Sequence, residues 1–195
     1  IPSSTDEEQE QFRFLLIARM LWDKGVGEFV EAARQLRKKY PHVEFCLLGF
    51  LDVQNPAAIS REQIQDWVEE GVVNYLGATD DVRPEIDNAD GIVLPSYREG
   101  TPRTLLEAAA MAKPIVATDA VGCREVVDHE TTGFLCKLYD ADDLAEKMEQ
   151  MLEMPNEARR EMGRHGRARV EQRFDEQFVI LKHQDAIDEI LYPVP

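Results

Sequence analysis

The chain has few positive charges and no long apolar segment. Its 195 residues include 22 Lys and Arg against 38 Asp and Glu, which gives a formal net charge of −16. Such an acidic balance argues against a nucleic-acid surface and against a broadly basic face that docks on membranes. No apolar run approaches the roughly 18–20 residues of a membrane-spanning helix, and no signal peptide is visible. We therefore expect a globular domain with a substantial core, without a nucleic-acid partner or a transmembrane segment.

Cysteine and histidine are also scarce. The three cysteines, Cys46, Cys123 and Cys136, are far apart and lie in apolar surroundings. Because they lack metal-ligand spacing, they predict buried free thiols and hence a reducing, cytoplasmic compartment. The histidines fall outside the ends of the expected strands, so we expect surface residues without an acid–base role: His42, His129, His165 and His183.

Three motifs of nucleotide and nucleophile chemistry are absent. The dinucleotide fingerprint G-x-G-x-x-G does not follow the first expected strand, and no G-x-x-x-x-G-K-[ST] sequence occurs. The nucleophile elbow G-x-S-x-G is missing as well. These absences argue against hydride transfer, P-loop phosphoryl transfer and esterase chemistry.

Short apolar segments alternate with segments of helical periodicity along the chain. The expected strands are 12–18, 43–49, 72–77, 91–96, 114–118 and 133–138. The expected helices are 27–40, 60–71, 81–88, 102–112, 122–128, 140–154, one opening at Pro155 and one over 175–191. This alternation, with near-continuous apolar strands, predicts a parallel sheet covered on both faces. We expect a single α/β domain, doubly wound and Rossmann-like, over 12–195 with a C-terminal helical tail, after a linker or tail over 1–11.

The segment REGTPRTLLE (98–107) places two glutamates around a tight turn. Thr101 is expected to cap the helix that follows, with Pro102 in the first helical position. Glu107 lies within LLEAAAMA, whose other residues are apolar, so the sequence predicts a helix buried all round. Two interpretations of Glu107 stay open: an i,i+4 pair with Arg103, or a carboxylate facing a cleft and accepting hydrogen bonds from ribose hydroxyls.

The start of this helix and the end of the first strand together suggest a phosphate site. Glu99 lies beside Gly100, which allows close backbone approach, and a helix N-terminus favours negative charge. Arg19 and Lys24 flank a turn closed by Gly25; alone they could be ordinary solvated charges. Combined with the two glutamates, they predict a site for a sugar attached to a diphosphate. The N–H groups expected to face the phosphate are those of Gly100, Thr101, Arg103 and Thr104.

Four segments carry a family resemblance: ARMLWDKGV (18–26), LLG (47–49), YLGATDDV (75–82) and PSYREGTPRTLLEAAAMAKPIVATDAVGCREVV (95–127). They resemble the C-terminal, nucleotide-sugar-binding half of the GT-B glycosyltransferases, specifically the large retaining family 4. The combination of R-x4-K-G with E-x7-E is specific to that family. The resemblance implies transfer of a sugar, with retention, from a UDP-linked donor to a glycan or lipid-linked acceptor. The form REGTPR is similar to the branch that builds bacterial surface polysaccharide and lipid-linked oligosaccharide.

The resemblance also assigns roles to residues. Arg19 and Lys24 would hold the donor diphosphate and stabilise the departing nucleotide, so that neither a metal nor another cofactor is expected. Glu99 would complete this catalytic set by contacting hydroxyls of the transferred sugar, and Glu107 would bind the ribose. The other donor-binding positions would be Gly49 near the donor, Gly77 at the start of a loop that lines the base, and Gly100, Thr101, Arg103, Thr104 and Leu105.

Two departures from the family pattern limit what the chain is expected to do. Pro102 stands where the family often has glycine, so its amide cannot donate a hydrogen bond. The chain begins Ile-Pro, so we expect a piece of a longer protein whose N-terminal acceptor-binding half is missing; alone it should bind donor and transfer nothing. We expect the whole protein to be cytoplasmic, either free or peripheral to the inner face of the membrane through that half. A late apolar stripe packs either on the missing half or on its own domain: Phe174, Phe178, Leu181 and Ile187.

The sequence leaves two other functions open. A nonhydrolysing UDP-sugar 2-epimerase shares the architecture, but the sequence shows no evident histidine or carboxylate arrangement for abstracting a proton at C2. A non-catalytic nucleotide-sugar sensor or interaction module is the third hypothesis. A second α/β half upstream would favour the transferase.

Overall fold

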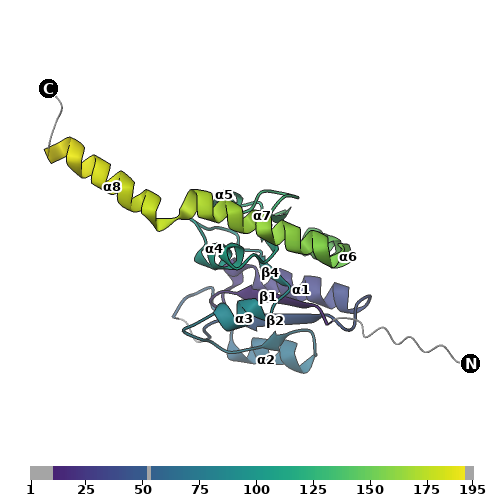
Figure 1. The fold of residues 1–195 in the computed structure, drawn as a ribbon. Helices are drawn as coiled ribbons and strands as arrows, with labels where there is room; N and C mark the ends of the chain where they lie inside the picture. The colour runs from purple at the N-terminus through teal and green to yellow at the C-terminus, as the bar shows by residue number, and fades with distance from the viewer. Residues whose placement is uncertain (1–10, 52–53, 192–195) are drawn as a thin grey trace, which may run out of the picture.

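Six short parallel strands form the centre of the molecule (Figure 1). The computed structural model describes residues 11–51 and 54–191. The strands lie in the order β3-β2-β1-β4-β5-β6 and every neighbouring pair is parallel, which confirms the doubly wound α/β fold. Their bounds are β1 Arg13–Ile17, β2 Glu44–Leu48, β3 Asn74–Tyr75, β4 Gly91–Leu94, β5 Ile115–Thr118 and β6 Gly133–Cys136. The expected linker over 1–11 lies, apart from Gln11, outside the described residues.

Helices cover both faces of this sheet. They are the 3-10 turn η1 Trp22–Lys24 and the α-helices α1 Val26–Arg37, α2 Arg61–Glu69, α3 Arg83–Asp87, α4 Arg103–Ala110, α5 Val121–Val126, α6 Ala141–Glu153, α7 Asn156–Phe174 and α8 Glu176–Leu191. Side chains of α1, α2 and α6 pack on one face around Phe14 and Phe45. Those of α3, α4, α5 and α7 pack on the other face around Leu15 and Ile92. Because successive residues of a strand point to opposite, equally covered faces, the strands are continuous apolar runs.

The edge strand β3 is shorter than the sequence predicts. Only Asn74 and Tyr75 pair with β2, whereas a strand over 72–77 was expected. Val72 and Val73 are buried in the core, and the N–H of Val72 donates to the end of α2 instead of to a strand. The apolar run therefore reflects packing beneath the sheet edge and not a full strand.

Helix α4 begins differently from the expectation. Its N-cap is Pro102, in an extended conformation, and no side chain caps the helix, so the predicted Thr101 cap is wrong. The carbonyl of Pro102 accepts the first helical bonds, so the proline lies outside the helix and not in its first position. The helix is also not buried all round: Leu105, Ala108 and Ala109 face the core, whereas its opposite side reaches solvent. That side carries Arg103, Glu107 and Ala110, so only short or charged side chains face the water.

Two glycines let the loops at the carboxyl edge of the sheet approach one another. Gly25 has a φ of 71°, and a Cβ there would lie 2.1 Å from the carbonyl oxygen of Pro95. A Cβ on Gly122, at the start of α5, would lie 1.4 Å from the carbonyl oxygen of Gly100. The loop between β4 and α4 is thus held between the loop after β1 on one side and α5 on the other.

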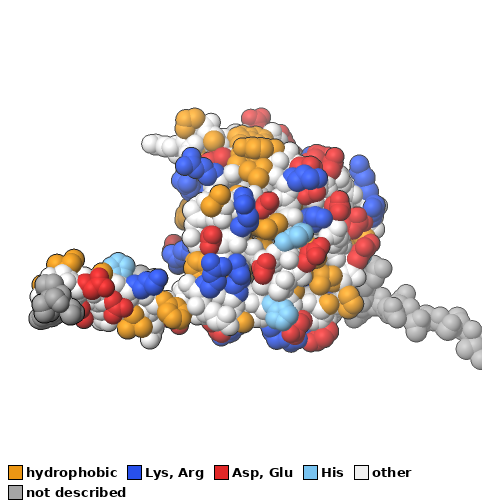
Figure 2. Space-filling model, turned by 90° about the horizontal axis from the view of Figure 1, so that it is seen from above, with side chains coloured by type: hydrophobic (Ala, Val, Ile, Leu, Met, Phe, Trp, Pro, Cys, Tyr) orange, Lys and Arg blue, Asp and Glu red, His pale blue; other side chains and the backbone are white. Residues whose placement is uncertain are grey.

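The last helix, α8, projects away from the sheet beyond the end of α7 (Figure 1). Phe174 packs against the core, but Phe178, Leu181 and Ile187 are 48%, 54% and 53% exposed. Figure 2 shows hydrophobic side chains along this projecting part. Of the two interpretations of the apolar stripe, packing of α8 on its own domain is therefore wrong. No helix in the described residues is long and apolar enough to cross a bilayer.

Replacing Gly122 by alanine tests the contact that holds the β4–α4 loop. Because the new Cβ would meet a backbone carbonyl, we expect the free energy of unfolding to fall by about 2–3 kcal/mol and Tm by roughly 5–10 °C, although alanine favours a helix. Gly100→Ala is the matched control, because a Cβ at that position meets nothing within 4 Å. Equal Tm values for the two variants in a thermal melt would contradict this packing.

Candidate functional site

The candidate site lies where β1 and β4, neighbours in the sheet, send their connections to opposite faces. In open α/β sheets ligands bind beyond the carboxyl ends of the strands at such a reversal. Two hydrogen bonds join the loops here: the N–H of Tyr97 and the hydroxyl of Ser96 both donate to the carbonyl of Asp23, at 3.0 and 3.2 Å. The two loops that carry the predicted residues are therefore fixed to each other.

Lys24 and Glu99 meet at this junction. Lys24 Nζ donates to Glu99 Oε1 at 2.7 Å, and the two side chains are only 18% and 14% exposed. The sequence predicted both as site residues but gave them different ligand groups, a phosphate and a sugar. The structure brings them into one ion pair, in which the two charges neutralise each other.

Arg19 lies in the same loop and is exposed. Within 11–51 and 54–191, its side chain contacts neither Glu99 nor any other carboxylate. Its carbonyl accepts the N–H of Leu21 at 2.7 Å, which fixes the backbone of the turn. The guanidinium is thus a charge at the edge of the site that can turn toward an anion.

Glu107 forms the i,i+4 pair with Arg103, which is one of the two interpretations that the sequence left open. Arg103 Nε donates to Glu107 Oε1 at 2.8 Å, with Arg103 89% and Glu107 28% exposed. An exposed i,i+4 pair of this kind contributes about 0.3–0.5 kcal/mol. Glu107 is therefore available to another partner at small cost.

The first turn of α4 is anchored to the end of β1. The hydroxyl of Thr104 donates to the carbonyl of Ile17 at 3.3 Å. Leu105 is fully buried, and its N–H donates to Pro102, so Leu105 fixes the helix and does not face the loops. Backbone N–H groups at the start of α4 find no backbone acceptor among the described residues, which is the usual state of a first helical turn: those of Gly100, Thr101, Arg103 and Thr104.

The loops after β2 and β3 also meet. The N–H of Gly49 donates to the carbonyl of Gly77 at 2.7 Å, and the hydroxyl of Tyr75 donates to the carbonyl of Gly49 at 2.7 Å. The N–H of Ala18 donates to Leu48. The structure therefore joins the two predicted glycines to each other, beside the loop that carries Arg19.

Sequence reasoning missed the residues that fix Tyr97 in the loop that carries Glu99. The hydroxyl of Tyr97 donates to Glu28 Oε1 at 2.6 Å, and its ring lies 4.2 Å from the ring of Tyr139. Burial, together with Glu28, raises the pKa of Tyr97 well above its usual range. Glu28 lies 69 residues before Tyr97. A contact over that separation leaves no local pattern, so no signal in the sequence could have found it.

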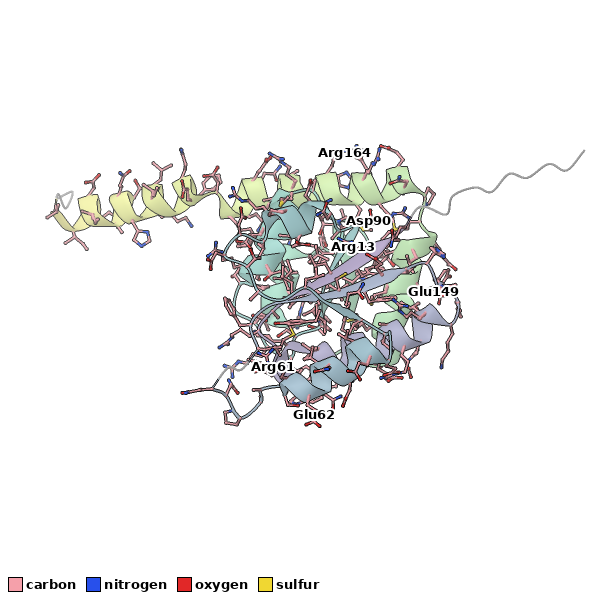
Figure 3. The ribbon with its side chains drawn as sticks, turned by 90° about the horizontal axis from the view of Figure 1, so that it is seen from below. Arg13, Arg61, Glu62, Asp90, Glu149 and Arg164 are labelled. Carbon is pink, nitrogen blue, oxygen red and sulfur yellow. The ribbon has the colours of Figure 1, made fainter. Side chains whose placement is uncertain are left out.

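An open hollow of about 300 Å³ lies beside Glu99. It is bordered by the loops after β4, β5 and β6, at Tyr97, Arg98, Glu99, Asp119, Ala120, Val121, Arg124 and Leu138. Another hollow, of about 230 Å³, lies at the opposite edge of the sheet near Asp90, which Figure 3 labels beside Arg13. None of the predicted site residues borders that second hollow.

The cysteines lie in the hydrophobic core. All three are buried and free, as predicted. Burial raises the pKa of the Cys123 thiol to about 11, so it is a thiol and not a nucleophilic thiolate near neutral pH. His42 is half-buried against Tyr40, which corrects the expectation of a surface residue. In the part of the chain that the structure describes, no three His, Cys, Asp or Glu side chains gather as a metal site would need.

One curated relative is similar over most of the chain. It is the N,N'-diacetylbacillosaminyl-diphospho-undecaprenol alpha-1,3-N-acetylgalactosaminyltransferase of Campylobacter jejuni, 43% identical over 139 residues. The match covers 71% of this chain and 35% of the relative, so the chain spans about a third of that protein's length.

Two solved structures have the same fold. The protein Alr3699/HepE of Anabaena, in complex with UDP, has a TM-score of 0.81 at 24% identity; the match covers 92% of this chain and 49% of that one. The C-terminal domain of a glycosyl transferase group 1 family protein from Francisella tularensis has a TM-score of 0.73 at 22% identity. That match covers 84% of this chain and 86% of that domain.

The family comparison agrees with both. Residues 11–154, which include both loops and every predicted site residue, match the family described as glycosyl transferases group 1. The chain therefore belongs to the glycosyl transferases group 1, which are family 4 of the GT-B glycosyltransferases.

Proposed function

We propose that this chain is the donor-binding half of a retaining glycosyltransferase that takes its sugar from a UDP-linked donor. The acceptor would be a glycan or a lipid-linked saccharide in bacterial surface-glycan synthesis. The observation that carries the proposal is the meeting of Lys24 and Glu99 at the reversal between β1 and β4. At this point one hydrogen bond joins a cation that can bind phosphate to a carboxylate that can accept hydrogen bonds from hydroxyl groups. The Campylobacter jejuni relative, which is named for an N-acetylgalactosaminyl transfer to a diphospho-undecaprenol-linked sugar, supports this acceptor class.

The diphosphate would lie between the loop after β1 and the start of α4. Lys24 and Arg19 would donate hydrogen bonds to its oxygens, and the unpaired N–H groups of the first turn of α4 would add a partial positive charge. As the bond from the anomeric carbon to the diphosphate breaks, negative charge grows on the leaving oxygen. These groups would stabilise that charge in the place of a metal ion, which is the electrostatic role that matters most in such a step.

The two carboxylates would act as hydrogen-bond acceptors. Glu99, at the border of the hollow, would accept bonds from hydroxyls of the transferred sugar. Glu107 would leave its exposed bond with Arg103 and accept bonds from the two ribose hydroxyls. The loops of Gly49 and Gly77 would line the base. The UDP complex of the similarly folded Anabaena protein supports a uridine nucleotide as the probe to try first.

The acceptor half would belong to the same protein. The chain spans about a third of its curated relative, and the exposed apolar side chains of α8 would pack on that other half. We propose a single donor-binding domain over 12–195, unable to transfer a sugar alone. The three buried free thiols support a cytoplasmic location, with any membrane association through the other half.

Calorimetric titration of the chain with UDP tests the metal-independent diphosphate site. We expect the same affinity in EDTA as in magnesium, because Lys24 and Arg19 supply the positive charge. GDP and ADP serve as controls for the base and should bind more weakly. A strict requirement for magnesium, or no heat of binding with any of the three nucleotides, would contradict the proposed site.

Glu107→Ala tests the ribose contact. We expect the affinity for UDP to fall about ten- to hundredfold, because hydrogen bonds to a charged group contribute roughly 1.5–3 kcal/mol. Glu171→Ala is the matched control: Glu171 forms the same kind of exposed i,i+4 pair, with Arg167 on α7. Unchanged UDP affinity in Glu107→Ala, measured by calorimetry, would leave Glu107 with only its surface pair.

A further inference from the structure

The charged groups proposed to bind the two parts of the donor neutralise each other in the free protein. Lys24 Nζ and Glu99 Oε1 are 2.7 Å apart, and both side chains are mostly withdrawn from water. A charge in such a place is costly unless it is paired. Breaking this pair is therefore part of the binding equilibrium. A ligand that forms a hydrogen bond with Lys24 also changes the hydrogen bonding of Glu99.

We propose that Glu99 is an internal counter-ion of Lys24 that makes the site discriminate between the sugar nucleotide and the bare nucleoside diphosphate. This inference rests on the proposed function and deepens it. The sugar nucleotide replaces both halves of the pair, since its diphosphate accepts from Lys24 and its sugar hydroxyls donate to Glu99. The bare diphosphate replaces only one half. Glu99 then shares the Lys24 ammonium with the diphosphate or loses its donor, and in both cases it lies mostly buried beside a second negative charge.

The backbone that carries Glu99 is held on three sides, which limits how far the carboxylate can move from Lys24. The N–H of Tyr97 is bonded to Asp23, and the Tyr97 hydroxyl is bonded to Glu28. The carbonyl of Gly100, the residue after Glu99, lies against Gly122 and leaves no room for a Cβ on Gly122. The rigid loop thus keeps the carboxylate at the place where the sugar is expected.

This arrangement has a consequence for turnover. After transfer of the sugar, the nucleoside diphosphate remains next to an unpaired carboxylate, and the return of Lys24 to Glu99 favours its release. The pair would lower the affinity for the product more than the affinity for the donor. This difference in affinity would limit inhibition by the nucleoside diphosphate product.

Glu99→Gln separates the two effects, because glutamine keeps the shape and can still accept a hydroxyl bond but carries no charge. We expect this variant to bind bare UDP roughly tenfold more tightly than the unchanged chain, as expected when a partly buried cation loses a competing partner. UDP-glucose, UDP-N-acetylglucosamine and UDP-N-acetylgalactosamine should gain less or lose affinity. The ratio of donor to UDP affinity therefore falls. Isothermal calorimetry in EDTA measures all four ligands.

Glu149→Gln is the matched control, because it removes a carboxylate from another lysine pair, Lys39–Glu149 at 3.0 Å. Figure 3 labels Glu149 on α6, and Lys39 follows the end of α1, at the edge of the sheet away from the site. This variant changes the net charge equally and should leave UDP affinity unchanged. In Lys24→Met, adding Glu99→Gln should give no further gain, because the cation is already gone.

The outcomes separate the two proposals. If the unchanged chain binds none of the four ligands, the proposed function fails. If it binds UDP but Glu99→Gln binds UDP equally or more weakly, the function stands and the counter-ion inference is wrong. An equal gain in Glu149→Gln would assign the effect to net charge and would also overturn the inference. If Glu99→Gln does not fold, as judged by its thermal melt, Glu99→Met gives the same comparison, with the same gain expected.

Discussion

The candidate site depends on one ion pair, Lys24–Glu99, which joins two loops across 75 residues of sequence. A lysine and a carboxylate that meet at 2.7 Å, both mostly out of water, stabilise each other only if the backbone on both sides is fixed. The hydrogen bonds to the carbonyl of Asp23 provide that fixation from β1, and the close approach of Gly122 provides it from α5. The parallel sheet explains why these segments are neighbours, because β1 and β4 pair although the chain visits β2 and β3 between them.

The net charge of the molecule restricts any attraction for a diphosphate to short range. With a formal net charge of −16, the molecule as a whole repels a nucleoside diphosphate, and the attraction must come from a few groups at short range. Lys24, Arg19 and the first N–H groups of α4, which we propose for this attraction, lie at the same edge of the sheet. The pair with Glu99 reduces the positive field of Lys24. In our proposal the same carboxylate weakens the attraction for phosphate and accepts sugar hydroxyls, so that one contact sets both affinity and selectivity.

The fold could be predicted from the sequence because each strand is buried on both faces, and such strands form a continuous apolar run. The prediction failed where tertiary packing determined the local structure. Val72 and Val73 resembled a strand but fill the core, and Thr101 resembled a helix cap although Pro102 is the residue whose carbonyl starts the helix. The candidate site residues were predicted from their spacing, but the contact between Lys24 and Glu99 and the hydrogen bond between Tyr97 and Glu28 are non-local. Neither leaves a periodicity, and only the folded chain brings them together.

A crystal structure of the chain with a bound UDP-sugar, prepared in EDTA, would show whether the donor replaces the Lys24–Glu99 pair. We expect Lys24 Nζ to leave Glu99 for a phosphate oxygen, Glu99 to accept a hydrogen bond from a sugar hydroxyl, and Glu107 to lie within hydrogen-bond distance of the ribose. A nucleotide bound at the opposite edge of the sheet near Asp90, or one bound beside an intact Lys24–Glu99 pair, would contradict this expectation.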